Sequence, residues 1–151
     1  MNTNWISKFI GLFLLIIFLG ACNTGKKEYV LPTGQHKVNV RLTAKSVEGL
    51  DAQYTFSRQV GSNAPERLGA GLARNNATEE LDGGIKNSGE VVFVEISFRA
   101  VTPTSTVTPN PAASYAVEIL VDGAVKTKVV IDAASKLNNT YYLAAVAKIT
   151  L

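Results

Sequence analysis

The chain of 151 residues is poor in the side chains on which most enzyme sites depend. It has one cysteine, Cys22, and one histidine, His36. Because Cys22 is assigned another role below, no thiol is left for a disulfide, a zinc site or a nucleophile. No nucleophile elbow, phosphate-binding glycine loop or dinucleotide motif is present. We therefore predict that the protein is not an enzyme and uses no metal or cofactor.

The chain also lacks a large excess of positive over negative charge. The formal net charge is +3, and lysine and arginine are spread along the whole chain. Proteins that bind nucleic acids gather basic residues on one face or along one helix. The sequence therefore predicts no nucleic-acid partner, and it implies no small-molecule substrate.

Residues 1–21 have the order of a secretory signal peptide. Lys8 and the free amine precede an apolar run of 11 residues at 9–19, and the small residues Gly20 and Ala21 follow. A transmembrane helix needs about 20 apolar residues, which is more than this run supplies. We expect export of the chain and removal of this segment.

The segment Leu19-Gly20-Ala21-Cys22 resembles the lipobox of bacterial lipoproteins. The resemblance implies cleavage before Cys22 and a diacylglyceryl thioether on its sulfur. Two or more acyl chains, such as palmitate, anchor a protein stably, whereas one chain binds only marginally. We expect a lipid anchor in the cell membrane, or in the outer membrane if the envelope has one, with the domain outside the cytoplasm. Cys22 is the one predicted site residue.

Residues 22–36 are polar and irregular and are predicted to be a tether. Residues 29–31 (Tyr-Val-Leu) are either part of this tether or a short first strand, and the sequence leaves both open. His36, at the junction with the domain, is predicted to be a solvated residue. The domain itself is expected to span 37–151.

Period-two alternation of apolar and polar residues predicts an all-β domain in the exported part. The strongest strand is expected at 90–101, with Ile96 and Phe98 facing the core and Glu95 and Arg99 facing solvent. On the same argument, Val92, Val94 and Ala100 face the core and Ser97 faces outward. Further strands are expected at 37–44, 53–60, 114–121, 124–132 and 140–151. We predict an antiparallel β-sandwich of about seven strands.

Two stretches are predicted to be loops. Residues 61–89, rich in glycine and asparagine, are expected to hold one or two short strands near 67–73 and 78–82. Residues 102–113 contain three prolines and are expected to form a long exposed connection. The acidic run at 79–84 (EELDGG) lacks the alternating ligands of a calcium loop, so an ordinary acidic turn is favoured.

The Asp122-Gly123 pair predicts a hairpin between the strands at 114–121 and 124–132. A two-residue loop would mix the two faces, since a slip of one residue turns every side chain over. We therefore predict a three-residue loop that sets Ile119 opposite Val125 and Glu118 opposite Lys126.

The segment 115–132 (YAVEILVDGAVKTKVVID), taken with the strand at 53–60, is similar to the C-terminal half of MmpS-type transport accessory proteins. Those are small membrane-anchored domains that end in a comparable hairpin. The resemblance implies an immunoglobulin-like sandwich and a role beside a transporter. Two departures stand out: the only tryptophan, Trp5, lies in the signal segment, and many family members are anchored by a helix.

These features together predict a membrane-tethered, non-catalytic binding or accessory module that works with another protein of the cell envelope. The alternative is a structural or surface-assembly component whose exposed strand edge pairs with other chains. Phe93 and Tyr142 face outward by strand phase; we expect a second packed face there, with a binding patch as the alternative.

Overall fold

The computed structural model describes residues 30–135 and 142–151. These residues form eight strands and no helix. The predicted β-sandwich is confirmed, with eight strands in place of about seven. The strands are β1 (Gln35–Lys45), β2 (Ala52–Gln59), β3 (Glu66–Leu72), β4 (Ala77–Asn87), β5 (Val91–Phe98), β6 (Ser114–Val121), β7 (Ala124–Asp132) and β8 (Leu143–Thr150).

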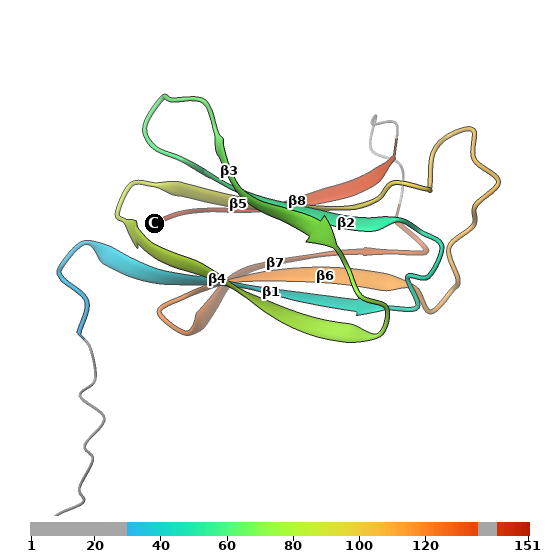
Figure 1. The fold of residues 1–151 in the computed structure, drawn as a ribbon, viewed down its shortest axis with the longest axis horizontal. Coiled ribbons are helices and arrows are strands. Elements are labelled where there is room, and N and C mark those ends of the chain that lie inside the picture. The colour runs from blue at the N-terminus through green and yellow to red at the C-terminus, as the bar shows by residue number, and fades with distance from the viewer. Residues whose placement is uncertain (1–29, 136–141) are drawn as a thin grey trace, which may run out of the picture. The chain divides into compact units, whose positions relative to one another are not determined.

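The strands form two antiparallel sheets of four that face each other (Figure 1). Their orders are β4-β1-β6-β7 and β3-β2-β5-β8. In an immunoglobulin constant domain the first two strands are neighbours in one sheet. Here β1 and β2 lie in different sheets, so the chain crosses between the layers at 46–51. The architecture is that of a sandwich, with its own strand order.

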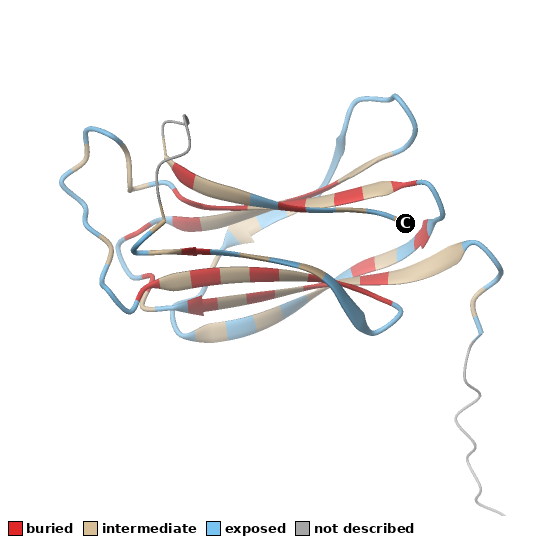
Figure 2. Cartoon of the chain, turned by 180° about the vertical axis from the view of Figure 1, so that it is seen from behind, coloured by how far each residue is buried: buried red, intermediate tan, exposed pale blue. Residues whose placement is uncertain are grey.

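The core lies between the sheets, where alternate residues of the central strands are buried (Figure 2). In β5 the side chains of Val92, Val94, Ile96 and Phe98 are fully buried, as their strand phase predicts. Phe98 stacks on Tyr115 of β6, with ring centroids 6.4 Å apart. On the opposite phase Arg99 is exposed and Glu95 partly exposed, but Ser97, expected outward, is buried. Val38, Val40, Leu42 and Ala44 of β1 are also in the core.

The start of the domain differs slightly from the predicted boundary. β1 begins at Gln35, so two residues assigned to the tether belong to the sheet. Val30 and Leu31 are not in a strand, and Tyr29 lies outside the described residues. The predicted signal segment 1–21 and the predicted lipidation site Cys22 also lie outside them.

The two short strands expected within 61–89, near 67–73 and 78–82, are confirmed as β3 and β4, but β4 is longer than expected and the segment is not mostly loop. It contains β3 and β4, and β4 pairs with β1 from Ala77 to Asn87, with a bulge at Gly83. Both are edge strands with many exposed side chains, so they need few apolar residues and their alternation is weak. Glu79, Glu80 and Asp82 are therefore strand residues and not an acidic turn.

The predicted register of the β6–β7 hairpin is also wrong. Asp122 and Gly123 form a two-residue loop with positive φ at both positions, as a type I′ turn requires. A register shift next to Ile119 then places Ile119 opposite Thr127 and pairs Glu118 with Lys128. The bulge restores the separation of faces that a plain two-residue loop would lose.

Candidate functional site

The connections between strands lie at the two ends of the sandwich, and the longest of them lies at one end. Because every strand pair is antiparallel, successive connections alternate between ends. The short connections 88–90 and 122–123 lie at the end where β1 begins, together with 60–65; we call this the tether end. The connections 46–51, 73–76 and 99–113 lie at the opposite end, which we call the loop end (Figure 1). The long exposed connection predicted at 102–113 is confirmed within 99–113.

The connections of the loop end are pinned to one another by side chains. The Asn76 side-chain oxygen accepts a hydrogen bond from the Ser46 amide at 3.0 Å, and the Asn75 oxygen accepts one from the Val47 amide at 2.9 Å. The long connection is held at its start, where the Ala100 amide donates to the Leu50 carbonyl at 3.1 Å. These hydrogen bonds hold the connections of the loop end in fixed positions relative to one another.

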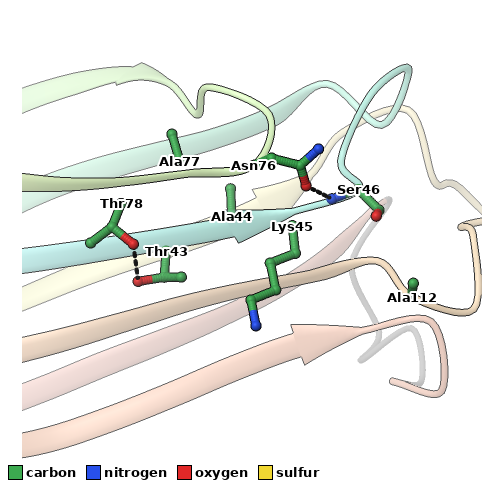
Figure 3. Close-up of a pocket in the computed structure, with 8 residues that line it drawn as sticks. All are labelled: Thr43, Ala44, Lys45, Ser46, Asn76, Ala77, Thr78 and Ala112. Atoms are coloured by element: carbon green, nitrogen blue, oxygen red, sulfur yellow. Dashed lines mark hydrogen bonds between the residues drawn. The ribbon is translucent and has the colours of Figure 1, made fainter.

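A shallow pocket of about 340 Å³ lies at the loop end, on the outer side of the β4-β1-β6-β7 sheet (Figure 3). Ser46 and Asn76 stand at its rim, and both have positive φ, near 50°. Residues other than glycine seldom adopt this conformation, and such positions gather at functional sites. The pocket is lined by Thr43, Ala44, Lys45, Ser46, Asn76, Ala77, Thr78 and Ala112.

The polar groups of this pocket are hydroxyls, an amide and one ammonium, with no carboxylate among them. The hydroxyls of Thr43 and Thr78 lie 3.2 Å apart across β1 and β4. The pocket can accept a polar or anionic group of a partner.

Behind this pocket, between the sheets, lies a narrow gap that has no room for a water molecule. Its floor includes Tyr115, whose hydroxyl is buried without a hydrogen-bond partner among the described residues. Burial raises the pKa of this hydroxyl above its usual value of about 10. Arg74 and Glu79 form an ion pair of 3.2 Å at its margin. Nothing in the sequence pattern of Tyr115 distinguishes it from an ordinary core residue.

His36 is not the solvated residue that the sequence predicts. Its Nδ1 lies 2.8 Å from the Asp122 carboxylate, and its Nε2 lies 3.2 Å from the Ser88 hydroxyl. This is the connectivity of a Ser-His-Asp triad. Asp122 and Ser88 are 86 and 52 residues from His36 in sequence, so no local pattern could have indicated the contact.

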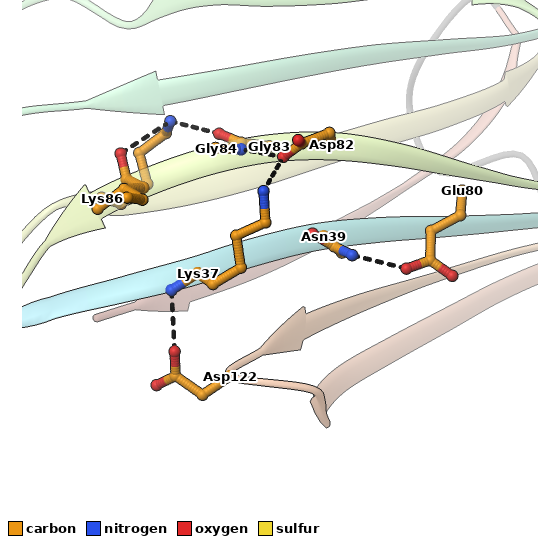
Figure 4. Close-up of polar contacts among 9 residues, drawn as sticks. Lys37, Asn39, Glu80, Asp82, Gly83, Gly84, Lys86 and Asp122 are labelled. Atoms are coloured by element: carbon orange, nitrogen blue, oxygen red, sulfur yellow. Dashed lines mark hydrogen bonds and ion pairs between the residues drawn. The ribbon is translucent and has the colours of Figure 1, made fainter. Parts of the chain in front are cut away.

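The hydrogen bonds around this cluster are those of a structural contact between segments and not those of a hydrolytic site. The two amides that could stabilise an oxyanion beside the Ser88 hydroxyl are used elsewhere: the Ser88 amide donates to Gly34 and the Gly89 amide to Leu151. Asp122 also accepts from the Lys37 amide at 2.8 Å (Figure 4). The cluster joins the start of β1 to two turns. That the protein is not an enzyme stays a prediction.

The acidic residues of β4 point to different partners and do not converge. Glu80 accepts from Asn39 at 2.6 Å and Asp82 pairs with Lys37, both on the outer face (Figure 4). The hydrogen bond from Lys37 lowers the pKa of Asp82 below its usual range. Among the described residues no group of three or more histidine, cysteine or acidic side chains is placed to hold a metal ion.

The buried charges of the tether end belong to Lys86 and Glu90. The Lys86 ammonium donates to the Gly83 carbonyl, beside the bulge of β4 (Figure 4). Burial would raise the pKa of Glu90, but hydrogen bonds from the Asn87 amide and side chain, with the positive charges of Arg58 and Lys86, lower it overall. Each of the two buried charged groups thus has hydrogen-bond partners within the fold that offset the cost of its burial.

The outward aromatics lie on the β3-β2-β5-β8 sheet. Phe93 is half-buried, and no third layer covers it in the part of the chain described here. The Arg99 guanidinium lies 4.6 Å from the ring centroid of Tyr142, and the Tyr142 hydroxyl donates to Glu95 at 3.3 Å. The expected second packed face is therefore absent from these residues.

Comparison with protein-family models, with curated proteins and with solved structures found no match to this chain. In residues 30–135 and 142–151 there is no helix long and apolar enough to cross a bilayer.

Proposed function

We propose that the protein is a lipoprotein of the cell envelope, anchored through Cys22, whose domain binds another envelope protein through its loop end. The proposal includes no catalytic step. One observation carries it: the long connection 99–113 and the pocket beside Asn76 gather at the end opposite the one where the N-terminal segment enters. Sandwich domains commonly bind through loops that a rigid scaffold holds at one end.

The length of β1 supports this arrangement. β1 runs from Gln35 at the tether end to Lys45 at the loop end. At about 3.3 Å per residue, these ten steps separate the two ends by roughly 33 Å. A lipid anchor before Gln35 would thus leave the loop end free to meet a partner away from the anchoring point.

Site-specific photo-crosslinking in intact cells tests the proposal. A photoreactive residue at Val107, in the 99–113 connection, should give a discrete cross-linked protein. The same residue at Val60, at the tether end, is the matched control, because both side chains are exposed to a similar extent, 38% and 46%. Cross-linking from Val60 alone, or equally from both, would contradict recognition by the loop end.

A structural or surface-assembly role is the second candidate. The observation that favours it is the edge strand β3, whose side chains are almost all exposed. An assembly role predicts ordered arrays of this chain alone, without a second protein.

A further inference from the structure

β3 is the one edge strand of the described sandwich that has no lysine, although it begins with Glu66 and Arg67. The two sheets end at β4, β7, β3 and β8. Edge strands commonly carry lysines or inward-pointing charges that prevent pairing with other chains. β4, β7 and β8 each contain at least one lysine, whereas β3 (ERLGAGL) has neither lysine nor proline. Its side chains at Leu68 and Leu72 are 37% and 65% exposed.

The pairing with β2 determines which backbone groups of β3 face outward. The Ala73 amide donates to the Ala52 carbonyl at 2.8 Å, so this pair is hydrogen-bonded. Along an antiparallel pair, hydrogen-bonded and non-hydrogen-bonded positions alternate. Gly71, opposite Tyr54, therefore faces β2, and Ala70, opposite Thr55, directs its N–H and C=O to the free edge.

The sequence around Ala70 is the same in both directions. Residues 68–72 read Leu-Gly-Ala-Gly-Leu, with Ala70 at the centre. In an antiparallel pair with a two-fold axis at Ala70, Gly69 faces Gly71 and Leu68 comes beside Leu72. The register shift of the β2–β3 pair falls at Leu68, so regular pairing is centred on residues 69–71. Such an isologous contact requires a self-complementary surface, which this segment provides.

We propose that two copies of this chain pair edge to edge through β3, in antiparallel orientation about a two-fold axis at Ala70. The Ala70 N–H of each copy donates to the Ala70 C=O of the other, and the two four-stranded sheets become one continuous sheet. The exposed leucines meet across the joint on the outer face. The Glu66 end of each strand comes toward Arg74 of the other copy; within one copy Glu66 pairs with Arg58 and Arg74 with Glu79.

This inference goes beyond the proposed recognition at the loop end and does not depend on it. It also differs from the assembly role, because a closed two-fold pair uses up the β3 edge of both copies. Growth beyond two copies cannot continue through that edge.

The test is the mass of the full chain purified in mild detergent, measured by sedimentation. Wild type should be a dimer. Ala70→Lys places like charges opposite each other on the axis and should give monomers. Val146→Lys is the matched control, since Val146 is 51% exposed on the edge strand β8, and it should remain dimeric. A monomeric wild type, a dimeric Ala70→Lys, a monomeric Val146→Lys or an open series of larger species would each overturn the proposal.

Cysteine cross-linking gives a second measurement, which detects the β3 contact directly and does not rely on a variant that separates the dimer. Hydrogen-bonded partners across an antiparallel pair lie about 5.5 Å apart at Cα, within the range that a disulfide spans. Under mild oxidation Ala70→Cys should yield a covalent dimer that wild type and Val146→Cys do not give. Failure of Ala70→Cys to cross-link, or equal cross-linking from Val146→Cys, would place the contact elsewhere.

Discussion

The side chains of Phe98 and Arg99 are neighbours in sequence with opposite environments. Phe98 is fully buried against Tyr115, while Arg99 follows the last residue of β5 and is exposed. Phe98→Ala should lower the free energy of unfolding by about 3–5 kcal/mol. Arg99→Ala should cost about 0.5–1 kcal/mol, because it removes an exposed cation–π contact with Tyr142. Urea unfolding of both variants measures this, and equal losses would mean that the strand phase is wrong.

Gly83 is needed for space at the bulge of β4. A Cβ at this position would lie 2.8 Å from the Val38 carbonyl oxygen and 3.1 Å from the Phe56 ring. Gly83→Ala should therefore destabilise the fold by about 1–3 kcal/mol through overpacking. Gly69→Ala is the control, since its Cβ would meet nothing within 4 Å. Thermal unfolding of the two variants compares them; a Gly83→Ala protein as stable as wild type would show that β4 can shift outward at no cost.

At the scale of single residues, burial was predictable where it follows pleated geometry alone. The inward set of β1 and most of β5 follow from alternation, because neighbouring side chains of a strand point to opposite faces. Ser97 was not predictable, since its burial on the outer face depends on neighbours from other strands. The same holds for His36, whose contacts with Ser88 and Asp122 arise only when three distant segments meet.

Among the elements, the β6–β7 turn is tied to the start of β1 through the Asp122 carboxylate. The hydrogen bond from His36, followed by that from the Lys37 amide, holds the pKa of Asp122 below its usual range. A carboxyl whose pKa is lowered on folding stabilises the native state above its unfolded pKa. That contribution is lost as the pH falls through the lower, folded pKa.

Asp122→Asn should accordingly be less stable than wild type near pH 7, and the difference should shrink at about pH 3 and below. Asparagine is suited to the positive φ of this position, so the turn itself is retained. Urea unfolding across this pH range measures the effect. In a His36→Ala background the substitution should cost less; an unchanged cost would show that the two side chains are not coupled.

The features that the sequence predicted incompletely or not at all depend on partner strands: the full length of β4, the register of the β6–β7 hairpin and the loop-end pocket. β4 has a charged and glycine-rich sequence, yet it forms a long strand because β1 supplies its hydrogen bonds from Gln35 to Ala44. The hairpin register depended on a bulge beside Ile119, and bulges leave little trace in an alternating sequence. The loop-end pocket was missed for the same reason, since Ser46 and Asn76 meet only through the pairing of β1 with β4.

For the whole molecule, the first question is the attachment to a membrane. Cys22 is the only cysteine and ends a short signal-like segment. Labelled fatty acid should enter wild type and be absent from Cys22→Ser, which lacks the thiol that forms the thioether. Incorporation at wild-type level in Cys22→Ser would contradict the lipoprotein assignment and with it the proposed location.

The central place of β1 in its sheet has a mechanical consequence. β1 is the strand that follows the N-terminal segment directly, and it is hydrogen-bonded on one side to β4 and on the other to β6. A pull between residues preceding Gln35 and a partner at the loop end acts along the axis of this strand. Its hydrogen bonds lie across that axis, so they are loaded together in shear and cannot open one after another. The strand through which force enters the domain is thus the one held from both sides.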